Sequence, residues 1–158
     1  MPELKFDFYD YKTLFVNSKD KSEALNTLFS QWDDKALSFW HLHYQKYDAD
    51  ETAKKHVCNN MLNGFIQRMD EKIRRHSLGC LGVYGSEPSH ELMALMLWRG
   101  SEIPPHMIDH PSFEYWTKKK LDIKNEADKK LILEYLTKIE EDTDQVEGRT
   151  VRSFNWYK

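Results

Sequence analysis

The sequence lacks most features that mark secreted, membrane or nucleotide-binding proteins. Its only cysteines, Cys58 and Cys80, form no Cys-x-x-Cys pair, so neither a disulfide framework nor a structural zinc site is expected. The longest apolar run, 92–98, is far shorter than the roughly 20 residues that span a membrane. The first ten residues lack the basic start and apolar middle of a secretory signal, so we expect a cytoplasmic protein.

A strong charge of either sign is also missing. Twenty-three Lys and Arg residues against 26 Asp and Glu give a net charge of −3, which creates no overall field that would attract a nucleic-acid backbone. Glycine-rich phosphate loops and the His-Glu-x-x-His and Gly-x-Ser-x-Gly motifs are absent, which argues against the common nucleotide-binding proteins and hydrolases. A hydrophobic content of 40% over 158 residues is typical of one globular domain.

Apolar residues at helical spacing predict three main helices. The first covers 24–32, with Ser22 as its N-cap, and the second covers 60–74. The third covers 125–141 and begins at Asn125, whose side chain is a favourable cap.

Alternating and continuous apolar runs predict the strands. The segments 77–85 and 91–100 form a hairpin, in which 92–98 is an interior strand covered on both faces. Further strands are expected at 38–47, 113–122 and 148–158, and the prolines in 101–111 predict an extended connection. The fold class is therefore α+β, a single compact domain with a central antiparallel or mixed sheet flanked by about three main helices.

The motif His41-x-His43 is the first candidate site. On a strand the two imidazoles point the same way, as two metal ligands would. No further histidine or carboxylate stands at a ligand-like spacing, which favours solvated or hydrogen-bonded histidines on the less buried face, with Trp40, Leu42 and Tyr44 in the core. A metal-dependent enzyme that uses His41 and His43 stays the alternative.

Two basic clusters are the second candidate, KIRRH at 72–76 and KKK at 118–120. They would form an RNA-contacting patch if they met in space. Acidic residues flank each of them, which favours ordinary solvated surfaces.

Six segments in order resemble the C-terminal domain of elongation factor 1-gamma, a subunit of the complex that recharges elongation factor 1-alpha with GTP. They are 6–17, 31–44, 60–70, 83–100, 113–122 and 148–158. The most specific motifs are Gly64-x-x-Gln67-Arg68-x-Asp70, Tyr84-Gly85, Arg99-Gly100 and Lys120-Leu121-Asp122. The sequence departs from the family pattern at Ala36, Lys118 and Phe154, and histidine is not typical of the family at 41 or 43, which argues against the metal site.

The resemblance implies that 1–158 is one domain shaped like a shallow dish, without the family's N-terminal glutathione-transferase-like domain and linker. It implies no catalytic residue, cofactor or metal, and a monomer that scaffolds or anchors the other subunits of the elongation factor 1 complex. Cytoskeletal, membrane-associated or RNA anchors are further options, and an RNA-contacting domain is the alternative function. The candidate partner-binding residues are the charged members of the matching motifs, Arg68, Arg99, Glu114 and Lys120.

Overall fold

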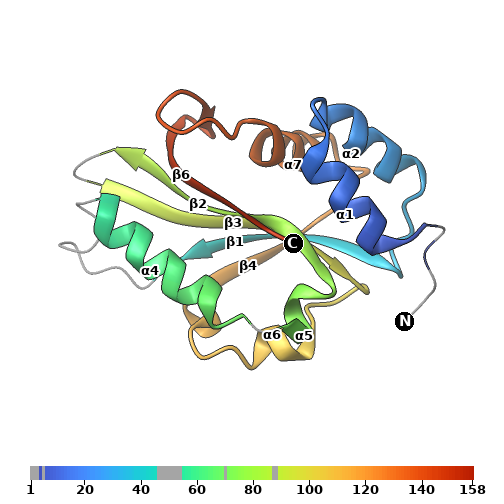
Figure 1. The fold of residues 1–158 in the computed structure, drawn as a ribbon, viewed down its shortest axis with the longest axis horizontal. Helices are drawn as coiled ribbons and strands as arrows, with labels where there is room; N and C mark the ends of the chain where they lie inside the picture. The colour runs from blue at the N-terminus through green and yellow to red at the C-terminus, as the bar shows by residue number, and fades with distance from the viewer. Residues whose placement is uncertain (1–3, 5, 46–54, 70, 87–88) are drawn as a thin grey trace.

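The computed structural model describes residues 4, 6–45, 55–69, 71–86 and 89–158. A curved six-stranded sheet forms the middle of the molecule, with strand order β4-β1-β3-β2-β6-β5 and antiparallel pairing throughout (Figure 1). The strands are β1 (Leu37–Tyr44), β2 (Ser77–Ser86), β3 (Ser89–Arg99), β4 (Trp116–Leu121), β5 (Gln145–Val146) and β6 (Arg149–Tyr157). The α+β fold class with an antiparallel central sheet is thus confirmed.

Helices cover both faces of this sheet (Figure 1). The longer ones are α1 (Phe8–Asn17), α2 (Lys21–Ser30), α4 (Lys55–Gln67) and α7 (Glu126–Thr137). The shorter ones are α5 (Glu71–Arg74), α6 (Pro105–Ile108) and the 3₁₀ turn η1 (Phe113–Tyr115). No helix among the described residues is both long and apolar enough to cross a membrane.

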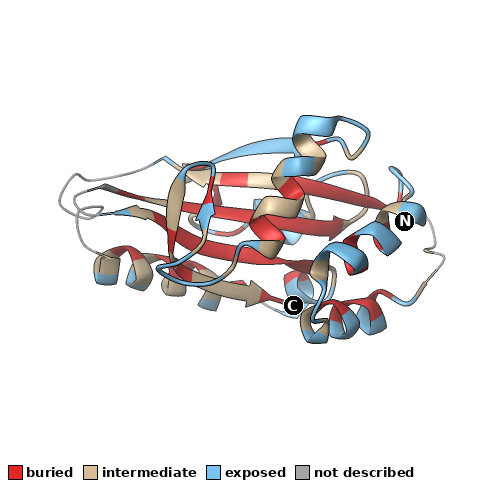
Figure 2. Cartoon of the chain, turned by 90° about the horizontal axis from the view of Figure 1, so that it is seen from above, coloured by how far each residue is buried: buried red, intermediate tan, exposed pale blue. Residues whose placement is uncertain are grey.

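Strand β3 has apolar side chains on both faces, which explains why helices pack on both sides of the sheet. Its side chains alternate, so that Met93, Leu95 and Leu97 pack towards α1, α2 and α7, while Met96 and Trp98 pack towards α4 and α5. Figure 2 shows the central strands buried along most of their length, whereas the edge strand β4 is largely exposed and the helices expose their outer faces. The predicted interior strand at 92–98 and its antiparallel pairing with β2 are confirmed.

The helix starts are set by side-chain caps. The Asp20 carboxylate accepts a hydrogen bond from the Glu23 backbone N–H at 3.1 Å, so the predicted cap at Ser22 is wrong by two residues. The Asn125 side chain accepts from the backbone N–H groups of Ala127 and Asp128 at 2.9 and 3.1 Å, which confirms this cap.

Three features differ from the prediction. Helix α1 was not expected, and its cap is Asp7, which accepts from the Asp10 N–H. The second helix begins earlier, at Lys55, and its predicted span 60–74 is divided between α4 and α5. The connection 101–111 is not wholly extended, because α6 begins at Pro105, where a missing N–H costs a helix nothing.

Other expectations are confirmed only in part: α2 begins and ends earlier than the predicted 24–32, α7 ends at Thr137 and not at 141, and 113–115 is a 3₁₀ turn. Strand β1 matches the described part of 38–47, β4 lies within 113–122, and β6 lies within 148–158. The structure does not describe residues 46–47, residues 87–88 between the two predicted hairpin strands, or Asp70 of the matching motif.

The glycines of β2 allow β-strand backbones to pack closely. A Cβ at Gly82 would lie 2.6 Å from the Ser153 carbonyl oxygen, and a Cβ at Gly79 would overlap the Leu95 carbonyl oxygen. Both obstacles are backbone atoms of neighbouring strands and cannot turn away, so only glycine fits.

Candidate functional site: a pocket at Arg68

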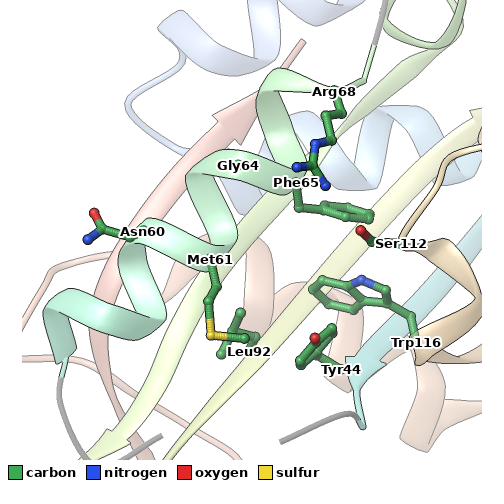
Figure 3. A pocket seen from close by; sticks show the side chains of 9 residues that line it. All are labelled: Tyr44, Asn60, Met61, Gly64, Phe65, Arg68, Leu92, Ser112 and Trp116. Carbon is green, nitrogen blue, oxygen red and sulfur yellow. The ribbon is translucent and has the colours of Figure 1, made fainter. Parts of the chain in front are cut away.

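A pocket of about 280 Å³ opens between α4, the end of β1 and the segment that leads into β4 (Figure 3). We call it the Arg68 pocket. Its lining residues come from four separate parts of the chain: Tyr44, Asn60, Met61, Gly64, Phe65, Arg68, Leu92, Ser112 and Trp116.

Aromatic rings form one wall of the Arg68 pocket. The Phe65 and Trp116 ring centroids lie 4.8 Å apart, and those of Tyr44 and Trp116 lie 5.4 Å apart at a steep angle. Leu92 is buried at the base, and Met61 points towards it (Figure 3). The wall is therefore apolar and rigid, because Phe65 and Trp116 are nearly fully buried and packed on one another.

Hydrogen-bond donors lie beside these aromatic rings. Figure 3 shows the Arg68 guanidinium, the Ser112 side chain and the indole nitrogen of Trp116 on one side of the pocket. Arg68 is exposed and forms no ion pair with any carboxylate in the described part of the chain. The buried Trp116 indole N–H likewise has no acceptor among the described residues. A buried donor without a partner costs about 1–3 kcal/mol, and the Trp116 nitrogen is too enclosed to meet a ligand directly, so Arg68 and Ser112 are the donors that a ligand can reach.

His110 holds this side of the pocket in place. Its Nε2–H donates to the Phe65 carbonyl oxygen at 3.0 Å, and its Nδ1 accepts from the Ser112 backbone N–H at 3.1 Å. A carbonyl can only accept and a backbone N–H can only donate, so the imidazole is neutral with its proton on Nε2. Burial lowers the pKa of His110, with a smaller contribution from the Arg68 charge, which keeps this neutral form in place.

Gly64 makes the pocket accessible. It lies inside α4, where glycine costs about 1 kcal/mol relative to alanine. A Cβ at this position would meet no atom within 4 Å, so close packing does not require the glycine. Gly64 itself is one of the residues that line the Arg68 pocket.

The chemistry of the pocket is that of recognition. The two donors, Arg68 and Ser112, beside an aromatic wall suit a group that carries acceptor oxygens next to an apolar or planar part, such as a carboxylate on a peptide segment. The only titratable side chains that line the pocket are those of Tyr44 and Arg68, and the pocket includes no described acid and base pair for proton transfer.

The structure does not bring the four candidate partner residues together. Only Arg68 lines the pocket. Arg99 lies beside His76 in a different depression, and Glu114 is exposed in η1. The Lys120 ammonium donates to the Ser101 carbonyl oxygen at 2.7 Å and lies 3.9 Å from Glu102.

The two histidines of β1 are hydrogen-bonded. His41 Nε2 lies 3.0 Å from the Tyr135 hydroxyl, and His43 Nε2 lies 2.5 Å from Glu91 Oε2. Within the described residues, no three His, Cys, Asp or Glu side chains gather as metal ligands. The face of the strand that carries the two histidines was expected to be the less buried one. Phe39 lies on this face and is only 1% exposed beneath α2, so the expectation was wrong at this residue.

Sequence reasoning missed His110, Ser112 and Trp116 as pocket residues. They stand close together in the sequence, but their partners Phe65 and Arg68 are more than 40 residues away, so no spacing connects them. The one usable signal was Gly64, a glycine within a strongly periodic helix.

A curved antiparallel sheet with helices on both faces defines an α+β domain. The family profile described as "Elongation factor 1 gamma, conserved domain" matches residues 1–102, and the chain belongs to this family.

Similar proteins from several organisms support the assignment. "Elongation factor 1-gamma 2" of Oryza sativa subsp. japonica is 32% identical over 161 residues, which cover 100% of this chain and 37% of the rice protein. "Elongation factor 1-gamma" of Prunus avium is 32% identical and of Drosophila melanogaster 28% identical, over 94% and 87% of the chain. The chain spans about a third of the length of these relatives: 34% of the Prunus protein and 31% of the Drosophila protein.

Proposed function

We propose that this chain is a non-catalytic scaffolding or anchoring domain of the gamma subunit in the elongation factor 1 guanine-nucleotide-exchange complex, in the cytoplasm. The family match supports a role in translation elongation. The Arg68 pocket carries the finer proposal, because it offers the donors Arg68 and Ser112 and an aromatic wall, as a recognition site does.

In this proposal, the Arg68 pocket receives a segment of another subunit of the complex. An apolar side chain of that segment packs on Phe65 and Trp116, and a neighbouring carboxylate accepts hydrogen bonds from Arg68 and Ser112. Arg68 is the only candidate partner residue that we retain for this contact. Arg99, Glu114 and Lys120 remain candidates for separate contacts.

Binding to purified subunits of the complex tests the proposal. Arg68→Gln removes the guanidinium charge from an exposed position, and Gly64→Ala fills part of the pocket. Arg68→Gln is expected to weaken binding about tenfold, the equivalent of one charge-assisted hydrogen bond, and Gly64→Ala is expected to weaken binding by crowding the pocket. Lys130→Gln removes an exposed charge from α7 on the other face of the sheet, and is expected to bind like the wild type.

A second measurement tests the non-catalytic part of the proposal. GDP release from loaded elongation factor 1-alpha is expected to proceed at the same rate with and without the chain. An acceleration of about tenfold, or a barrier lowered by about 1.4 kcal/mol, would show that the domain acts on exchange itself. Unchanged binding by both pocket variants would reject the Arg68 pocket as the partner site.

A further inference from the structure

A second cavity, of about 470 Å³, lies between α1, α5 and the end of β6. Figure 1 shows the last residues of the chain between these two helices. Its lining includes four cationic side chains, Lys12, Arg74, Arg75 and Lys158, and one carboxylate, Glu71. We call it the Lys12 cavity, and the described side chains that line it carry an excess of three positive charges.

Lys12 is the unusual member of this group. Its side chain is only 7% exposed, and its ammonium donates to the Arg74 carbonyl oxygen at 3.1 Å. None of the carboxylates that the structure describes lies within 4.0 Å of it. Burial lowers the pKa of Lys12, and the charges of Arg74 and Lys158 lower it further. A buried ammonium next to other cations is costly to keep charged unless an anion joins it.

Glu71 does not supply that anion. Its side chain is 84% exposed and lies 3.6 Å from Arg75, one helical turn away, an arrangement of small energetic value. The positive charge continues into the neighbouring depression, which shares Tyr9 and Arg75 with the cavity and is also lined by His76 and Arg99. The Asp7 carboxylate in that depression already accepts the capping hydrogen bond of α1.

We propose that the Lys12 cavity binds a phosphate monoester, with Lys12, Arg74 and Arg75 contacting the phosphate and the Tyr9 ring covering the group that carries it. A doubly charged phosphate matches the charge excess better than a single carboxylate, and guanidinium groups suit its oxygens. The cavity is larger than a phosphate needs, and Tyr9 is 73% exposed beside it, so the carrier also finds a surface to contact.

RNA is a poorer match for the same charges. A nucleic-acid strand follows an extended basic groove, whereas these cations surround one cavity on a chain of net charge −3. The other basic cluster does not extend the cavity, because Lys118 lies over the Phe113 ring, Lys119 is 3.8 Å from Asp128, and Lys120 donates to the Ser101 carbonyl oxygen.

Titration of the ¹⁵N-labelled 158-residue chain with phosphoserine, serine, inorganic phosphate and a short single-stranded RNA tests the proposal. Phosphoserine is expected to shift the amide signals around Lys12, Arg74 and Arg75, and serine is not. Lys12→Met and Arg75→Gln are each expected to weaken phosphoserine binding at least about tenfold. Lys19→Met is the matched control, because Lys19 is an exposed lysine seven residues after Lys12 that does not line the cavity. This variant is expected to bind phosphoserine like the wild type.

Each contrary result is distinct. Equal affinity for inorganic phosphate and phosphoserine would overturn the contact between the carrier and Tyr9. Preferential binding of RNA, or an equal loss in the Lys19→Met control, would overturn the phosphate-monoester site, as would no binding at all. Arg75 is exposed, so Arg75→Gln keeps the test valid should Lys12→Met fail to fold. The site uses none of the Arg68 pocket, so its failure leaves the proposed function standing.

Discussion

The Tyr135 hydroxyl lies 3.0 Å from His41 Nε2 and 2.6 Å from Glu147 Oε2, so it joins helix α7 to strand β1. A carboxylate can only accept, so the hydroxyl donates to Glu147 and accepts the Nε2–H of a neutral His41. Burial raises the pKa of Tyr135 and lowers that of His41 to about 4, so both groups stay uncharged at neutral pH. The histidine pair of the sequence motif therefore includes a member that ties a helix to the sheet.

The first prediction is a loss of stability in mild acid. The pKa of His41 is about 4 in the folded chain, lowered chiefly by burial and partly raised by Glu147, against about 6.5 when unfolded. Above about pH 6.5 the imidazole is neutral in both states and contributes no pH dependence. As pH falls from about 6.5 towards 4, the unfolded chain binds a proton that the folded chain does not, so stability decreases by up to about 3 kcal/mol.

Urea unfolding between about pH 7 and pH 4.5 measures this effect. The His41→Gln variant cannot titrate at this position but keeps a donor for Tyr135, and is expected to lose less stability over the same window. Equal losses in both proteins would assign the acid sensitivity to other groups.

The second prediction concerns Tyr135→Phe. The change leaves the His41 N–H without its acceptor and Glu147 without its donor, and is expected to lower the free energy of unfolding by about 1–3 kcal/mol. Tyr9→Phe removes a hydroxyl from a side chain that is 73% exposed, and is expected to change stability by less than about 0.5 kcal/mol. Equal stability of the two variants would show that the network around Tyr135 contributes nothing.

The hydrophobic pattern correctly predicted those helices and strands whose local sequence agrees with their burial in the fold. The unbroken apolar run 92–98 favoured a strand covered on both faces, and Asn125 stood directly before a periodic segment. Helix α1 escaped notice because its apolar residues alternate with charged ones over a short segment, and its contacts, such as the Tyr11 hydroxyl with the Ala24 carbonyl at 2.9 Å, are tertiary. The cap of α2 was misplaced because Asp20 and Ser22 are both good caps.

The sites were less predictable than the fold because they are assembled by the topology. Arg68 and Trp116 share a pocket only because β1 pairs with β4 and α4 packs over the sheet. Likewise, the basic segment 72–76 meets Lys12 and Lys158 and does not share a cavity with 118–120. The sequence identified the charged residues, but which of them lie together in one cavity could be known only from the order of the strands in the sheet.

The third prediction is that Leu95→Asp unfolds the chain. Leu95 is fully buried in the middle of β3, where a carboxylate would have no partner, and the cost of several kcal/mol approaches a total stability of about 5–15 kcal/mol. Leu14→Asp in α1 is the control, because Leu14 is 57% exposed. A native circular dichroism spectrum and a cooperative melt for Leu95→Asp would contradict the burial of β3.

The fourth prediction is that Gly82→Ala destabilises the chain by about 1–3 kcal/mol. The added Cβ would lie 2.6 Å from the Ser153 carbonyl oxygen and 2.9 Å from the Tyr84 hydroxyl, so β2 and β6 would have to separate. Thermal melting with an unfolding enthalpy measures the change. An unaltered melting temperature would mean that the pairing of β2 with β6 is looser than the register indicates.

The last prediction contrasts this with Gly64→Ala, which is expected to stabilise the chain by up to about 1 kcal/mol. Gly64 is inside α4, a Cβ there would meet no atom within 4 Å, and alanine loses less backbone entropy on folding than glycine. The same methyl group would enter the Arg68 pocket, so the stability gain should come with weaker partner binding. Urea unfolding and the binding assay on one preparation measure both effects. A variant that is more stable and binds as well as the wild type would show that Gly64 does not serve the pocket.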